Sequence, residues 1–161
     1  QRILLIPPGK QSEFNEVKSL SDFRALQKTG AFGSNWYDIK IWQANRLKYQ
    51  VVTGDWHKIY NMLVHGDRDI DYFSRGVIEI SAEAKLHPKL QIEKTLLLIY
   101  ERDFVFYLSG VTQKYEQILF EALSQAENNN LIVEMQRDHW QRDFRQLQLD
   151  SRIIIRLEQP D

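Results

Sequence analysis

Along the chain, short β-like runs of hydrophobic residues alternate with longer stretches in which apolar residues recur at helical spacing. This alternation is typical of an α/β domain and differs from the patterns of a sandwich or a helix bundle. A closing Ile153-Ile154-Ile155 is either a last strand or a docking tail. The predicted strands cover residues 2–6, 49–52, 69–73, 96–100 and 104–108, and the predicted helices cover about 20–26, 36–47, 56–65, 74–86, 112–126 and 131–144.

Turn and capping residues punctuate these elements. Ser19 precedes Asp22 by three residues, which predicts a capping box at the start of the first helix. The small and polar residues 29–35 predict a turn that leads into the next helix. We see neither an internal repeat nor a low-complexity linker.

Composition sets limits on size and on partners. The chain has 161 residues, which suits one globular domain with a core and a tail. A formal net charge of -1 offers no basic field for nucleic acid and no polybasic face for an anionic membrane. The lack of cysteine excludes disulfides, a thiolate metal site and a cysteine nucleophile.

The start of the chain suggests a larger protein. No apolar run approaches the roughly 20 residues that span a bilayer, and no signal-like stretch is present. The sequence begins at Gln1, without an initiator methionine, and enters a predicted strand at once. We therefore expect a processed protein or a fragment whose preceding part is missing.

The predicted turn before the second helix is a candidate anion site. Gly30 and Gly33 flank it, and a loop that feeds a helix leaves backbone N–H groups that suit a carboxylate or phosphate. The alternative is an ordinary capped turn with Ser34 or Asn35 as the N-cap. The turn lacks the complete signatures of a P-loop and of a dinucleotide fingerprint.

A second candidate lies at residues 67–75, where acids and arginines surround the end of a predicted strand. Alternation along this strand places Asp71 and Phe73 on one side. Arg75 follows them, and a guanidinium there suits a ligand carboxylate, which it can hold through two hydrogen bonds. The alternative is a solvated, salt-bridged turn.

Other reactive residue types form no catalytic or metal pattern. His57, His65, His87 and His139 are scattered, so we expect neither a metal nor another cofactor. Glu79 and Glu83 share a helical face, which more often is simply solvated. Ser34 has no neighbouring histidine in the sequence that would activate it. The four tryptophans are expected mostly in the core, although Trp36 could stack on a ligand.

Several blocks, in this order, resemble one bacterial family, namely periplasmic solute-binding proteins of the amino-acid kind (family 3, type 2 fold). They look like the second half of such a protein, particularly of a branch with an aspartate-tyrosine-phenylalanine-proline-arginine-glycine stretch. The blocks are the strand 2–6, Ser19-Leu20-Ser21-Asp22-Phe23, Gly33-Ser34-Asn35-Trp36-Tyr37-Asp38, Asp71-Tyr72-Phe73-Ser74-Arg75-Gly76-Val77-Ile78-Glu79-Ile80 and the run 100–109.

The resemblance implies a three-layer α/β lobe with a mixed central sheet flanked by helices. Residues 1–6 would be a first hinge strand, 7–103 the second lobe, 104–110 a second hinge strand, and 111–161 a helical C-terminal segment that returns to a first lobe largely absent here. A solute would bind between the lobes. The ligand-binding residues implied in this lobe are Ser34, Asn35, Trp36, Asp71, Phe73 and Arg75.

The sequence departs from the family pattern in two places. Amino-acid binders place an aspartate near the position of Arg75-Gly76, so a more acidic solute becomes plausible here. Ser74 replaces the branch's usual proline, a change that the sequence does not explain.

By this resemblance we expect a periplasmic, non-enzymatic protein that binds a small polar solute, amino-acid-like or carboxylate-bearing. It would act with an ABC transporter permease or a sensor, and not with nucleic acid. Two alternatives stay open. One is a sensor or enzyme-associated module that uses the same fold. The other is a lobe that forms a homodimer through its exposed surface.

Overall fold

The computed structural model describes residues 1–102 and 105–160, which divide into two compact units. The first unit contains Gln1–Glu101 and the chain from Leu147 on. The second unit is Arg102–Gln146. The first unit is a mixed α/β structure in which one sheet is flanked by helices, so the predicted fold class is confirmed.

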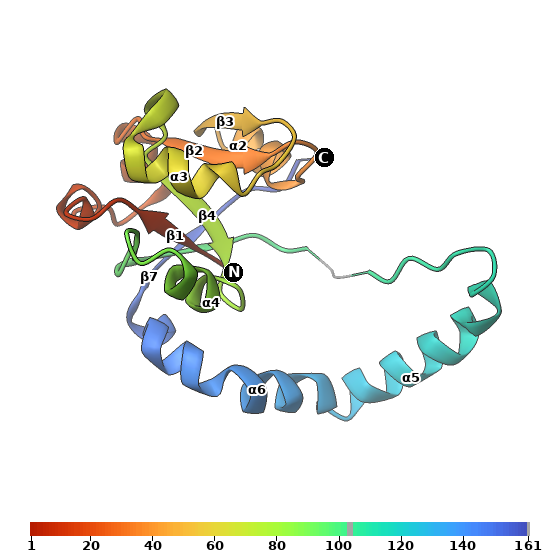
Figure 1. Ribbon diagram of the computed structural model, residues 1–161. Helices are drawn as coiled ribbons and strands as arrows, with labels where there is room; N and C mark the ends of the chain where they lie inside the picture. Colours follow the sequence, from red (N-terminus) through yellow and green to blue (C-terminus); the bar gives the residue numbers. More distant parts are fainter. Residues whose placement is uncertain (103–104, 161) are drawn as a thin grey trace. The chain divides into compact units, whose positions relative to one another are not determined.

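One mixed sheet organises the first unit, in the order β3-β2-β4-β1-β6-β7, with β5 paired to β1 outside this path. Strands β1, β2, β3, β4 and β7 are labelled in Figure 1. The parallel pairs are β2/β3, β2/β4 and β6/β7, whereas β1 runs antiparallel to both β4 and β6. The strands are β1 (Arg2–Ile6), β2 (Thr29–Gly33), β3 (Lys48–Val52), β4 (Tyr72–Gly76), β5 (Gln91–Ile92), β6 (Leu96–Ile99) and β7 (Ile153–Arg156).

These directions bring several strand ends to one edge. β2, β3 and β4 are parallel and end there, and Arg2 at the start of β1 pairs with Gly76 at the end of β4. Arg2 also pairs with Leu98 near the end of β6. We call this edge the carboxyl edge, and it is where open α/β sheets commonly present ligand-facing groups.

Helices cover both faces of the sheet. Phe23 of α1 and Trp42 of α2 belong to a buried cluster with Leu4 and Tyr72 on one face, whereas Tyr60 of α3 contacts Phe73 on the other. The α-helices are α1 (Leu20–Ala25), α2 (Asp38–Ala44), α3 (Lys58–His65), α4 (Ile80–Leu86), α5 (Glu116–Asn128) and α6 (Leu131–Leu147), and short 3-10 helices lie at Gln11–Glu13, Asp67–Asp69, Gln113–Tyr115 and Leu149–Ser151.

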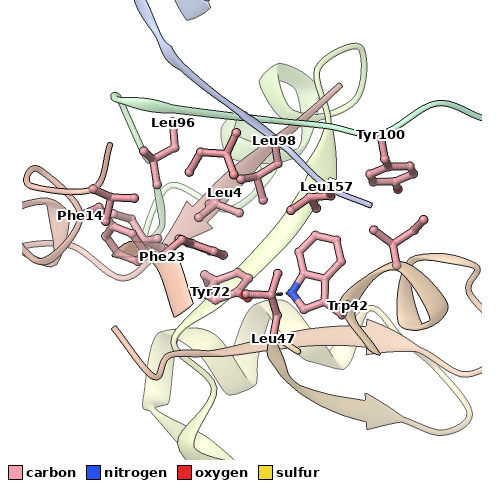
Figure 2. Packing of buried hydrophobic residues seen from close by; sticks show 14 of the residues in the cluster. Leu4, Phe14, Phe23, Trp42, Leu47, Tyr72, Leu96, Leu98, Tyr100 and Leu157 are labelled. Atoms are coloured by element: carbon pink, nitrogen blue, oxygen red, sulfur yellow. Dashed lines mark hydrogen bonds between the residues drawn. The ribbon is translucent and has the colours of Figure 1, made fainter. Parts of the chain in front are cut away.

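A cluster of large side chains fills the face of the sheet under α1 and α2 (Figure 2). Trp42 and Tyr72 are both fully buried, and the Trp42 indole N–H donates to the Tyr72 hydroxyl over 2.8 Å. The Phe23 ring lies 5.6 Å from the Tyr72 ring. The hydrogen bond gives each of the two buried polar atoms a partner, which removes the cost of burying them.

Residues 29–33 form a strand and not the predicted turn. Gly30 and Ala31 of β2 are buried and pair with Tyr72 and Phe73 of β4. A Cβ on Gly30 would lie 2.6 Å from the Tyr72 ring, so only glycine permits this approach. The small residues of this segment therefore do not mark a turn. Gly30 leaves room for the large Tyr72 side chain of β4 to lie across β2.

The strand predicted at 69–73 lies three residues later, at Tyr72–Gly76. Ser74, Arg75 and Gly76 are therefore buried strand residues and not the start of a helix. The 3-10 turn at Asp67–Asp69 occupies the first part of the predicted strand. Arg68 and Asp69 in it have positive φ values of 58° and 53°, which a strand does not allow.

Other predicted elements are confirmed. The Ser19 hydroxyl accepts a hydrogen bond from the Asp22 amide, as the capping box predicts. Strands form at both ends of the first unit, including the closing isoleucine run as β7.

Of the predicted strand 104–108, Phe104 lies outside the described residues, and residues 105–108 form neither helix nor strand. The segment 111–161 is expected to be helical, but near its end it forms the strand β7, which pairs with β6.

A buried arginine fixes β7 beside β6. Arg152 donates to the Leu147, Glu93 and Leu96 carbonyls over 2.7 to 3.0 Å, and its guanidinium lies 3.6 Å from the Glu93 carboxylate. Burial lowers the Arg152 pKa, and attraction to Glu93 opposes this shift. Glu93 is fully buried and accepts from the amides of Thr95 and Leu96. These bonds satisfy charges that would otherwise be costly to bury.

The second unit consists mainly of α5 and α6 up to Gln146. Within this unit no described residue is fully buried. In the part of the chain that the structure describes, no helix is both long and apolar enough to cross a membrane. The unit exposes large apolar side chains at Val105, Phe106, Tyr107, Val111, Tyr115, Ile118, Phe120, Leu123, Leu131, Val133 and Met135.

The core hydrogen bond predicts the effect of Tyr72→Phe. This substitution leaves the buried Trp42 N–H without an acceptor, so we expect the free energy of unfolding to fall by about 1–3 kcal/mol. Denaturant unfolding measures it. Tyr49→Phe is the matched control, since the Tyr49 hydroxyl bonds Gln43 at the surface. Equal losses in the two variants would contradict the prediction.

Substitution of Ser74 should have the opposite effect on the free energy of unfolding. Its hydroxyl is fully buried and has no hydrogen-bond partner among the described residues. Ser74→Ala should therefore raise the free energy of unfolding by about 1 kcal/mol. The exposed Ser12→Ala control should stay within about 0.5 kcal/mol of the parent in the same denaturant titration. A loss of stability in Ser74→Ala would show that the hydroxyl has a stabilising partner.

Candidate functional site

Six ionisable side chains meet at the carboxyl edge, and they come from five separate elements. Each is placed by a strand end or by the first or second turn of a helix that follows a strand. These residues are Arg2 at the start of β1, Asp38 at the start of α2, Arg75 near the end of β4, Glu79 and Glu83 before and within α4, and Tyr100 after β6.

Arg2, Asp38 and Tyr100 form one half of this group. The Arg2 guanidinium lies 3.1 Å from the buried Asp38 carboxylate and donates to the Tyr100 hydroxyl over 2.9 Å. The Tyr100 hydroxyl in turn donates to Asp38 over 2.6 Å. Burial opposes the charge on Arg2, but attraction to Asp38 together with the contacts to Tyr100 and Glu79 raises the Arg2 pKa. Burial also raises the Tyr100 pKa, so its hydroxyl stays protonated.

Arg75 and Glu83 form the second half. Arg75 Nε and Nη2 donate to the two carboxylate oxygens of Glu83 over 2.7 and 2.5 Å, which is a bidentate pair. The Arg75 side chain is 8% exposed and that of Glu83 is 16% exposed. Burial disfavours the charged Arg75, but hydrogen bonding to Glu83 together with attraction to Glu79 and Glu83 raises its pKa.

Glu79 links the two halves. Its Oε2 lies 3.3 Å from Arg75 Nη2 and 3.6 Å from Arg2 Nη1, and it accepts from the Gly76 amide over 3.1 Å. The Glu79 side chain is 44% exposed, which makes it the most open carboxylate of the group. Two arginines face three carboxylates, so the group carries a formal charge of -1.

Three aromatic rings surround the Arg75 guanidinium. Its Cζ lies 5.1 Å from the Trp36 ring, 5.0 Å from the Trp56 ring and 5.1 Å from the Phe73 ring. These distances fall within the range of cation–π attraction. We call Trp36, Trp56, Phe73 and Glu83 the Arg75 cage. Tyr60 packs edge-on against Phe73 beside it, and burial raises the Tyr60 pKa.

The structure brings together three of the predicted site residues, namely Trp36, Phe73 and Arg75. Ser34 and Asn35 follow β2 at the same edge, but their surroundings differ from the predicted anion site. The Ser34 amide donates to the Val52 carbonyl and the Trp36 amide to the Gly33 carbonyl, so these two amides are not free for a ligand. Asn35 is exposed, with a positive φ of 67°.

Asp71 lies apart from the other predicted residues. It precedes β4 and therefore sits at the opposite end of that strand from Arg75. It accepts from the Thr29 amide over 2.8 Å and from Lys28 over 3.2 Å, and Lys28 also pairs with Glu13. Burial opposes the Lys28 charge, but these carboxylates raise its pKa. These contacts tie the start of β4 to the start of β2.

Arg2, Asp38 and Tyr100 were missed as site residues. Arg2 and Tyr100 were seen only as parts of predicted strands, and Asp38 only as part of a helix. A charged or hydroxyl-bearing residue at the end of an otherwise apolar strand was the available signal, but the hydrogen bond from Arg2 to Tyr100 joins residues 98 positions apart. Glu79 and Glu83 were noted as a pair but were expected on a solvated face.

A group of three or more histidine, cysteine, aspartate or glutamate side chains that could hold a metal ion is not found among the residues that the structure describes. The site chemistry visible here is that of paired charges and aromatic rings. Such an arrangement can hold a small polar group by charge, hydrogen bonding and stacking.

Two solved structures resemble the chain in fold. An ancestral cyclohexadienyl dehydratase is 14% identical with a TM-score of 0.42, and the match covers 85% of this chain and 55% of that one. An ancestral arginine-binding protein bound to arginine is 15% identical with a TM-score of 0.41, covering 56% of this chain and 39% of that one. No family model and no curated protein matches the sequence.

The chain thus spans about half the length of the first of these structures, and less of the second. At these identities and TM-scores the similarity concerns the path of the chain alone, and we draw nothing from it about a ligand or an activity.

The pairing of Arg75 predicts that this residue is structural. Arg75→Met keeps apolar volume but leaves Glu83 without its partner, so we expect the free energy of unfolding to fall by about 3 kcal/mol. Glu79→Gln, at a more exposed pair, should cost less than about 1 kcal/mol. Denaturant unfolding of both variants checks this, and a smaller loss for Arg75→Met than for Glu79→Gln would contradict it.

Proposed function

We propose that the carboxyl edge binds a small polar solute and that Arg2 and Glu79 are its charged contacts. The observation that carries the proposal is the charged network at this edge, where Glu79 lies between Arg2 and Arg75 and remains 44% exposed. The edge is where open α/β sheets bind ligands. Partly buried charges there act through a lower dielectric than water, which strengthens their attraction for a solute.

An amino-acid-like solute suits these two contacts. Glu79 offers a carboxylate to an ammonium group, and Arg2, 22% exposed, offers a guanidinium to a carboxylate. Arg75 is a less suitable contact because Glu83 already binds it through both carboxylate oxygens. A solute that carries both charges would pair with both residues, whereas a purely acidic solute would meet a group of net negative charge.

The same side chains favour binding over chemical conversion. Tyr60 and Tyr100 have raised pKa values, so neither serves readily as a base at neutral pH. Asp38 and Glu83 are each held by an arginine. A base for catalysis needs a pKa near the working pH, and these tyrosines are shifted away from it.

The sequence resemblance supports a wider proposal about the whole protein. In it, this lobe closes with another lobe over the solute by hinge motion, outside the cytoplasm, and delivers the solute to a transporter or sensor. A lobe that only dimerises would differ from it because no solute would stabilise the protein, whereas a module of a larger sensor or enzyme would differ in the domains that accompany it.

A thermal-shift screen tests the proposed contacts. Amino acids, dicarboxylates and small peptides are added separately, and we expect amino acids to raise the melting temperature most. A ligand at a hundredfold excess over its Kd stabilises the folded state by about 2.7 kcal/mol. Glu79→Gln should abolish most of this shift while the melting temperature without solute changes little.

Glu16→Gln is the matched control for this screen. Glu16 is exposed and lies in the segment that follows β1, away from the carboxyl edge. It should keep the full shift with amino acids. No shift with any of the three classes, or an equal loss in Glu16→Gln and Glu79→Gln, would refute the proposed contacts.

A further inference from the structure

The Arg75 cage surrounds one guanidinium with all the groups that such a cation needs. Trp36, Trp56 and Phe73 place ring centroids 5.0 to 5.1 Å from the guanidinium carbon, and Glu83 binds two of its nitrogens at 2.7 and 2.5 Å. Arg75 itself is 6% exposed. Aromatic faces and a bidentate carboxylate together select a planar, delocalised cation over a compact ammonium.

Three of the four cage residues come from elements other than β4, whereas Phe73 lies in β4 two residues before Arg75. Trp36 follows β2, Trp56 precedes α3 and Glu83 lies in α4. The rings of Trp36 and Trp56 contact each other, with centroids 5.2 Å apart, and Trp56 also contacts Phe73 at 6.1 Å. The rings therefore support one another as well as the guanidinium, which favours a cage that persists when the guanidinium is removed.

We infer that Trp36, Trp56, Phe73 and Glu83 form a guanidinium-binding site in which Arg75 is the resident ligand, and that this site takes a free guanidinium compound when the Arg75 side chain is removed. The ligand class is a small alkylguanidinium. Glu79 also lies 3.3 Å from Arg75 Nη2, but the inference does not require that a solute binds Glu79 or Arg2, because the three rings and Glu83 hold the guanidinium without one.

The test is chemical rescue of Arg75→Ala. This variant should melt at a lower temperature than the parent, and methylguanidinium at millimolar concentration, far below denaturing levels, should restore several degrees. Trp36 and Trp56 line the cage, so tryptophan fluorescence should change with a saturable dependence on methylguanidinium. General denaturation by a guanidinium salt would lower the melting temperature, which is the opposite sign.

Three controls make the rescue specific. The parent should not respond, because Arg75 fills the cage. Methylammonium should rescue Arg75→Ala much less than methylguanidinium, because it lacks the planar fork of donors. Adding Glu83→Gln to Arg75→Ala should remove most of the rescue, because the bidentate carboxylate is lost.

If Arg75→Ala is unfolded without additive, the same comparison is made by circular dichroism as refolding on addition of each compound. The inference is overturned if methylguanidinium neither raises the melting temperature nor promotes refolding of Arg75→Ala. It is also overturned if methylammonium acts equally well, or if the parent gains as much as the variant. These outcomes are independent of any solute response at Glu79.

Discussion

The withdrawal of two arginines from water at the carboxyl edge, Arg75 buried and Arg2 partly buried, is the constraint around which this part of the structure is arranged. A guanidinium cannot lose its charge in a protein, so each one that leaves water needs anionic partners. Arg75 draws Glu83 of α4 onto the end of β4, and Arg2 draws Asp38 of α2 onto the start of β1. These pairs tie the helices on the two faces of the sheet to its central strands.

The same requirement shapes what the edge offers a solute. Because Arg75 is satisfied within the chain, its presence near a strand end does not by itself indicate an anionic ligand. Glu79, shared by the two arginines and half exposed, leaves the edge slightly negative. A solute with both charges fits this balance better than the acidic solute that the position of Arg75 first suggested.

Local signals and long-range packing contributed differently to what could be predicted. The capping of α1 by Ser19 and the helical stretch of α6 depend on neighbouring residues, and both were predicted. The small residues of Thr29–Gly33 predict a turn, but the segment is a strand. Gly30 is small there because the bulky Tyr72 ring lies across it. That ring is distant in sequence, so no local pattern contains it.

By itself, the sequence determined the α/β class and most helices and strands, because hydrophobic periodicity and caps act over a few residues. Only the tertiary structure decided that Glu83 neutralises Arg75, that Asp71 lies at the opposite end of β4, and that Arg2 meets Asp38 and Tyr100. Those partners are set by strand order and register, which join residues up to 98 positions apart.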